Sequence, residues 1–219
     1  MMKVRVEVVS DVVCPWCYIG KRRLERAMRQ LNDKFDFEVH YLPFELNPQM
    51  PAEGSSQKDY LSAKFGGEER YKKLTDHVTQ IAASEGLAFQ FEKQHVSPNT
   101  RNAHRLIWLA DQHGKQLQMK EALMKAYFTD GVDLAQAKNL IEIAKQQGLP
   151  EESLTDFFES EEGVAEVQFA ERMNHQRGIT SVPFYIINGK YGISGAQPTE
   201  TFIKVFEEIA SVSVEGEDR

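Results

Sequence analysis

Cysteine is scarce in this sequence of 219 residues: the two cysteines, Cys14 and Cys17, stand three positions apart. A secreted domain held together by disulfides needs more cysteines, spread along the chain. A structural disulfide framework is therefore excluded. A close pair of this kind is typical of a catalytic site or of a metal site in a reducing compartment.

Long apolar runs and basic clusters are missing as well. No stretch approaches the roughly 20 apolar residues that a membrane-spanning helix needs. Residues 1–10 show strand-like alternation with charges among them, which is unlike a secretory signal, so we expect a cytoplasmic protein. The net charge is −7, and the densest basic run, residues 21–23, fits the solvated face of a helix. Neither a nucleic acid nor a membrane is therefore an expected partner.

The beginning of the chain has the pattern of an α/β fold. Residues 3–9 alternate, with three valines on one face, and predict a strand. Helical spacing follows over residues 14–32, and residues 37–41 alternate again as a second strand. Three prolines within residues 43–54 predict a loop and a domain boundary.

The middle of the chain is mainly helical, and its end returns to strands. The spacing predicts helices near residues 71–86, 99–114, 116–128, 134–147, 151–159 and 162–177, the first with Tyr71, Leu74, Val78 and Ile81 in one stripe. Residues 184–187 and 191–194 predict a hairpin around Asn188-Gly189, and residues 199–211 a last helix. We therefore expect a discontinuous α/β domain over 1–54 and 178–219, with an inserted helical domain over 55–177.

The cysteines occupy the point where the first strand passes into the first helix. The unpaired N–H groups and the positive dipole end of a helix stabilise a thiolate there relative to the thiol. We therefore expect Cys14 to be the exposed nucleophile, and Cys17, one turn further on and more buried, to resolve a mixed disulfide. Pro15 suits the first helical turn, and Trp16 can shield the pair from water.

Two other interpretations of the pair remain open at this point. Half of a zinc site is one, but there is no second cysteine pair and no His-x₃₋₅-His spacing, so we expect no metal. Two inert buried thiols are the other, since free cysteine often packs as a small apolar residue. The strand–Cys-Pro-Trp-Cys–helix context favours a redox-active pair over both.

Three strings in order resemble the DsbA family of the thioredoxin superfamily, and its FrnE-like cytosolic branch most closely. They are SDVVCPWCYIGKRRLE near the start, PFELNP after the second strand, and SVPFYIINGKYGISGAQP near the end. The resemblance spans nearly the whole chain. It implies a thioredoxin-like fold with a large all-helical insertion, and thiol–disulfide oxidoreductase activity.

The resemblance also assigns residues to the site beside the cysteines. It implies a catalytic Pro183 with a cis bond after Val182, whose backbone can pair with a bound peptide in β fashion. Ser181, and less directly Thr180, are expected to line the same groove. Pro15, Trp16, and Asn99 and His104 of the insertion are expected to contact the substrate, although a helix cap and a solvated face would also explain the last two.

Two acids near the cysteines are candidates for moving the proton of Cys17. Asp11 and Glu7 are the residues concerned. The simpler interpretations are a turn residue for Asp11 and a strand-edge charge for Glu7.

One departure from the family pattern concerns the reduction potential of the pair. Strongly oxidising secreted members usually carry Pro-His between the cysteines, whereas this chain carries Pro-Trp, so we expect a less oxidising pair.

The sequence thus predicts disulfide exchange with protein or small-thiol substrates, with no bound cofactor beyond the Cys14–Cys17 disulfide and with glutathione as a possible co-substrate. A glutathione-dependent isomerase or transferase of the kappa or 2-hydroxychromene-2-carboxylate type is the alternative, although those proteins typically use serine at the position of Cys14. A chaperone-like peptide-binding module is the second alternative. Monomer and homodimer both remain open.

Overall fold

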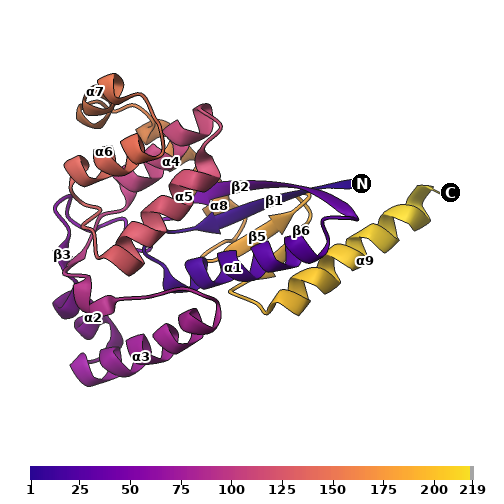
Figure 1. Ribbon diagram of the computed structural model, residues 1–219, viewed down its shortest axis with the longest axis horizontal. Helices are drawn as coiled ribbons and strands as arrows, with labels where there is room; N and C mark the ends of the chain where they lie inside the picture. Colours follow the sequence, from indigo (N-terminus) through magenta and orange to yellow (C-terminus); the bar gives the residue numbers. More distant parts are fainter. Residues whose placement is uncertain (218–219) are drawn as a thin grey trace.

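The computed structural model describes residues 1–217, with side chains as far as residue 211 (Figure 1). Its main sheet has the strand order β2-β1-β5-β6. Strand β1 (Met2–Ser10) pairs in parallel with β2 (Phe35–Pro43) and antiparallel with β5 (Phe184–Ile187), which forms a hairpin with β6 (Tyr191–Ser194). The predicted α/β class and the succession of the predicted strands along the chain are confirmed.

Helices α1 (Pro15–Gln30) and α9 (Thr199–Glu217) cover one face of this sheet (Figure 1). The alternating valines of β1 pack against Leu24 of α1 and Phe202 and Phe206 of α9. The hairpin turns at Asn188 and Gly189, both with positive φ, as the predicted tight turn requires. Helix α9 continues beyond Ser211, where the sequence pattern placed its end, and residues 218–219 lie outside the described part.

The insertion is helical apart from one two-residue ladder between β3 (Ser55–Ser56) and β4 (Val96–Ser97). Its α-helices are α2 (Gln57–Phe65), α3 (Glu68–Ser84), α4 (Arg101–Gln112), α5 (Gln116–Lys125), α6 (Ala137–Gln146), α7 (Leu154–Glu159) and α8 (Val164–Gln176). Short 3₁₀ helices lie at Phe91–Lys93 and Glu151–Ser153, and a π-helical turn follows α5 at Ala126–Asp130. The expected stripe on α3 is partly wrong, because Leu74 is 42% exposed. Helix α3 lies at the periphery (Figure 1), and its buried residues are Val78 and Ala82, nearer its end.

The beginning of α1 is buried in the core of the insertion. Cys14, Cys17 and Tyr18 belong to the same apolar cluster as Leu106 of α4 and Leu123 of α5. The insertion therefore covers the cysteine pair directly. The boundaries of the two expected domains stay a prediction.

The outer edge of β2 is closed by side-chain amides. Gln116 at the start of α5 accepts the Tyr41 N–H at 2.7 Å and donates to the Tyr41 carbonyl at 3.3 Å. Asn174 of α8 donates to the Pro43 carbonyl at 3.1 Å. These bonds satisfy backbone groups that an edge strand otherwise leaves free for another chain.

In residues 1–217, no helix has the length and apolar character required to cross a bilayer.

A charged network joins α1 to the insertion through Glu121 of α5. Its carboxylate accepts the Tyr18 hydroxyl at 2.6 Å and contacts Lys21 and Arg22. Burial alone would raise the pKa of Glu121, but the hydrogen bonds and charges of Arg22 and Lys21 lower it to about 2. Because the folded pKa lies below the ordinary value, this stabilisation is complete above about pH 4.5 and is lost as the pH falls towards 2.

We expect Glu121→Gln to lower the free energy of unfolding by about 1–2 kcal/mol at pH 7, and by much less at pH 3. Urea unfolding of both proteins at the two pH values measures the difference. Glu142→Gln, which removes an exposed carboxylate paired with Lys145, is the matched control and should change little. A Glu121→Gln deficit that is equally large at pH 3 would contradict the ionic origin of this stabilisation.

Candidate active site

The turn between β1 and α1 places both cysteines on the first helical turn. Cys14 is the residue before the helix, with extended backbone angles (φ −88°, ψ 112°), and Pro15 follows as its first helical residue. The Cys14 carbonyl accepts the N–H groups of Cys17 at 3.1 Å and Tyr18 at 3.4 Å. The expected position of the pair, at the passage from strand to helix, is therefore confirmed.

Cys14 is not exposed, contrary to expectation. Both thiols are free, and Cys14 is 4% and Cys17 2% exposed. The cover comes from the segment before β5 and from the insertion, which local periodicity does not place. A substrate therefore has to approach a nearly buried sulfur, next to Trp16, which is 38% exposed.

The two thiols interact with each other. Burial raises the pKa of Cys17 well above its ordinary value, and the hydrogen bond and charge of Cys14 raise it further. The charge of Lys120 and the backbone of Asp11 oppose this effect. The raised pKa favours the protonated form of Cys17, which fits a residue that acts second.

The bond between Val182 and Pro183 is cis, as the family resemblance implied. The Cys14 thiol lies 3.8 Å from the Val182 carbonyl oxygen, so this segment borders the nucleophile. Val182 precedes β5 and stands outside its ladder, whose first pair is Val9 with Phe184. Ser181 is exposed next to it. This segment thus offers a backbone edge beside Cys14.

A cleft is lined by Val13, the residue before Cys14. Its volume is about 70 Å³, and its walls come from the loop after β2 and from α2. Apolar side chains dominate the lining, and Lys64 contributes a cation: Val13, Leu46, Met50, Tyr60, Leu61 and Lys64. Polar residues Asp11, Asn47, Ser97 and Thr100 complete its walls.

Asp11 is buried beneath the turn and fully engaged. One carboxylate oxygen accepts the Leu46 N–H at 2.8 Å, and the other lies 3.3 Å from His104 Nε2. Burial alone would raise the pKa of Asp11, but His104, the Leu46 N–H and the charge of Lys120 hold it below its usual value. Asp11 is thus a carboxylate that fixes the loop after β2, and its expected part in proton transfer stays a prediction.

Glu7, Asn99 and His104 each have structural contacts, and their expected roles in proton transfer and substrate binding stay predictions. Glu7 alternates with the valines that face α1, so it points from the opposite face of β1 and bonds to Arg5 at 3.1 Å. Asn99 donates to the Met50 carbonyl at 2.7 Å and so anchors the loop after β2. His104 is buried and bonds to Asp11 and to the Phe44 carbonyl at 3.1 Å, so it is not part of an exposed substrate surface.

Lys120 is the residue that sequence reasoning missed. It stands on α5, 1% exposed, and its charge acts on Cys17, Asp11 and Cys14. A signal did exist, since Lys120 shares the buried helical stripe of Met119, Leu123 and Met124.

Among the residues that the structure describes, no group of three or more His, Cys, Asp or Glu side chains is arranged to hold a metal ion.

The chain matches the family model described as "DSBA-like thioredoxin domain" over residues 5–207. It is 33% identical to the probable DsbA oxidoreductase SCO1869 from Streptomyces coelicolor, with a TM-score of 0.87 over 94% of this chain and 89% of that one. It is also 27% identical to YwbO of Bacillus subtilis, over 94% of this chain and 98% of that protein.

Two more distant structures share the fold alone. A 2-hydroxychromene-2-carboxylate isomerase is 11% identical, with a TM-score of 0.69 over 98% of both chains. The cytosolic disulfide reductase DsbM from Pseudomonas aeruginosa, solved with GSH, is 16% identical, with a TM-score of 0.64 over 94% of this chain and 99% of that one.

Proposed function

This chain belongs to the DSBA-like thioredoxin domain family, and we propose that it exchanges disulfides with protein or small-thiol substrates through Cys14 and Cys17. One observation carries the proposal. Cys14 and Cys17 share the first turn of α1, and the Val182 carbonyl oxygen lies 3.8 Å from the Cys14 sulfur. This arrangement supports the proposed roles of Cys14 as nucleophile, Cys17 as resolving thiol and Val182 as a backbone edge for the substrate.

The exchange has two steps. The Cys14 thiolate attacks one sulfur of a substrate disulfide, breaks that bond, and releases the first substrate thiolate, which leaves a mixed disulfide. Cys17 then loses its proton and attacks the Cys14 sulfur, which releases the second substrate thiolate and closes the Cys14–Cys17 disulfide. The substrate gains two electrons, and the pair loses two. The oxidised pair can run the same steps in reverse.

The proposed substrate lies between the cis-proline segment and the apolar cleft. An extended peptide can pair with the backbone of Val182, while Pro183 has no N–H to offer. Trp16 and Pro15 border the pair on the exposed side, and the cleft beside Val13 accepts an apolar side chain. The burial of Cys14 favours extended or small substrates over folded surfaces.

We further propose that the protein works in the cytoplasm and that glutathione is its redox partner. The scarcity of cysteine and the shared fold with DsbM, described as cytosolic and solved with GSH, support this part. A cytosolic glutathione poise keeps an ordinary dithiol reduced, so the resting form is the dithiol. The protein then acts mainly as a reductase.

A glutathione-dependent isomerase is the second candidate, favoured by the common fold with the 2-hydroxychromene-2-carboxylate isomerase over 98% of both chains. Such chemistry uses a bound glutathione thiolate and has no need of a resolving thiol. Isomerase turnover that survives Cys17→Ala would favour this candidate. Turnover of disulfides that requires both cysteines favours the exchange reaction.

The direct test is a redox titration of the purified protein in glutathione buffers, with the free thiols counted by alkylation and mass spectrometry. We expect both thiols to disappear together, in one two-electron transition, as the proportion of glutathione disulfide rises. Species that carry glutathione on Cys14 should be minor, because Cys17 displaces it. Two free thiols that persist in excess glutathione disulfide would refute the exchange reaction.

A further inference from the structure

Lys120 of α5 is a buried lysine without an ion-pair partner. It is 1% exposed, and its Nζ lies 3.4 Å from the Ser10 carbonyl oxygen and 5.4 Å from the centre of the Tyr41 ring. Among the described residues, no carboxylate lies within ion-pair distance of this nitrogen. An unpaired charge is costly to bury, so these surroundings favour the neutral amine. A neutral amine has a free electron pair and is a nucleophile.

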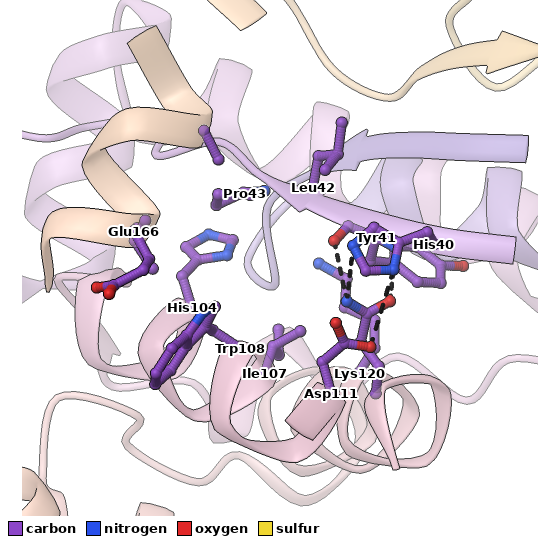
Figure 2. Close-up of a pocket in the computed structure, with 13 residues that line it drawn as sticks. His40, Tyr41, Leu42, Pro43, His104, Ile107, Trp108, Asp111, Lys120 and Glu166 are labelled. Atoms are coloured by element: carbon purple, nitrogen blue, oxygen red, sulfur yellow. Dashed lines mark hydrogen bonds and ion pairs between the residues drawn. The ribbon is translucent and has the colours of Figure 1, made fainter. Parts of the chain in front are cut away.

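Lys120 also lines a cavity between β2, α4 and α8, which Figure 2 shows. The cavity has a volume of about 90 Å³, and neither cysteine lines it. It opens to solvent beside His40 and Asp111, whose side chains are partly exposed. Most of the remaining wall is apolar: Leu42, Ile107, Trp108, Val167 and Ala170. The cavity is therefore a place where an organic molecule can meet the Lys120 side chain.

The charges in the wall disfavour two classes of ligand. The carboxylates of Asp111 and Glu166 disfavour an organic anion, and Lys120 itself disfavours an organic cation. The apolar lining favours an uncharged organic molecule. Its size is limited, because a cavity that holds benzene has a volume of about 150 Å³. A small aldehyde meets these conditions, and its carbonyl carbon reacts with a neutral amine.

We propose that Lys120 binds small aliphatic aldehydes covalently in this cavity, as a Schiff base. The Lys120 nitrogen uses its electron pair to form a bond to the carbonyl carbon, and the electrons of the C=O double bond move to the oxygen. The oxygen then leaves as water with the two hydrogens of the amine, and a C=N bond remains. The step requires no oxidant or reductant, and water reverses it. This inference is independent of disulfide exchange.

The surroundings of Lys120 also increase the amount of its reactive form. Burial lowers the pKa of Lys120 to about 8, although negative charge on Cys17, Asp11 and Cys14 opposes this, and the cation Lys21 lowers it further. At pH 7, about 10% of an amine with this pKa is neutral, against roughly 0.04% of an ordinary lysine. Lys120 therefore has roughly 200-fold more of the nucleophilic form than an exposed lysine.

The test is reductive trapping of propanal on the folded protein at pH 7. Sodium cyanoborohydride converts each imine into a stable propylamine, and peptide mass spectrometry measures the rate at each lysine. We expect Lys120 to be propylated at least about tenfold faster than Lys125, an exposed lysine on the same helix, although Lys120 is the more buried. The difference should vanish in urea, because it depends on the fold. Propylation of Lys120 no faster than that of Lys125 in the folded protein would overturn the proposal.

Competing molecules test the class of ligand. Propionamide is uncharged and similar in size to propanal, but its carbonyl group does not react with amines. We expect it to slow the propylation of Lys120 and to leave that of Lys125 unchanged. Propionate should protect Lys120 less, because of the carboxylates in the wall. Stronger protection by propionate than by propionamide would indicate an anion site and would overturn the assignment to aldehydes.

A variant of the wall tests the cavity while Lys120 stays in place. Ala170→Leu should narrow the cavity and slow the propylation of Lys120 about threefold or more, with no change at Lys125. Ala170→Ser, which adds only one oxygen atom, is the matched control. An unchanged rate at Lys120 in Ala170→Leu would show that the aldehyde does not pass through this cavity and would overturn its part. Protection by propionamide tests the same point in the wild type, should Ala170→Leu fail to fold.

Discussion

Replacement of Cys17 by serine is expected to leave the protein covalently joined to its substrate. Without the resolving thiol, the mixed disulfide on Cys14 has no neighbour to displace it and persists until an external thiol arrives. Multiple-turnover reduction of a protein disulfide should fall by at least about a thousandfold, because residues that act as one unit fail together. Non-reducing electrophoresis and mass spectrometry would detect the trapped adduct.

Replacement of Cys14 by serine should abolish the adduct as well as the turnover. Cys17 is 2% exposed and held as a protonated thiol by its surroundings, so it cannot substitute as the nucleophile. The variant pair thus gives opposite products at equally low turnover: an adduct for Cys17→Ser and free protein for Cys14→Ser. An adduct that forms through Cys17 in the Cys14 variant would reverse the assigned roles. Equal turnover in the wild type and both variants would mean that the cysteine pair takes no part in the reaction.

The strands and turns near the site could be predicted from the sequence because their signals are local. Alternation over β1 and the Asn188-Gly189 pair each specify a conformation within a few residues. The start of α1 follows from the same local logic, with Pro15 at the first helical position. Local rules therefore predicted correctly that the cysteine pair lies where β1 passes into α1.

The surroundings of the pair could not be predicted in the same way. A periodic pattern shows which face of an element is buried, but not which distant element covers it. The burial of Cys14 depends on the insertion and on the segment before β5, which meet only in the folded chain. Glu7 is a different case, because the alternation of β1 already placed it opposite the valines that pack on α1.

Lys120 shows how a predicted helix can still conceal a buried charge next to the site. Periodicity gives α5 a buried stripe, and a lysine within that stripe contradicts the usual preference of charged groups for solvent. Local conflict of this kind tends to occur at functional sites. The conflict can be seen in the sequence, but its meaning depends on β1 and α1, which bring Ser10 and Cys17 to the same place.

The last prediction concerns the close approach of α1 to the cis-proline segment. Gly20 follows Cys17 by about one turn, and a Cβ at this position would lie 2.1 Å from the Tyr185 hydroxyl and 3.3 Å from Pro183 Cγ. Only glycine therefore lets α1 lie directly against this segment. We expect Gly20→Ala to destabilise the protein by about 1–3 kcal/mol, despite the better helix propensity of alanine.

The clash between an alanine methyl group at position 20 and Tyr185 should depend on the Tyr185 hydroxyl, so a second variant can test it directly. The Tyr185 hydroxyl is buried and has no hydrogen-bond partner among the described residues, so Tyr185→Phe alone should stabilise the protein by about 1 kcal/mol. The same change removes the atom that a Gly20→Ala methyl group would meet. Urea unfolding of the two single variants and the double variant should therefore show strong coupling, with the double variant close to wild type. Strictly additive free energies would mean that the backbone of α1 moves instead, and the distance between Cys14 and Val182 would then change with it.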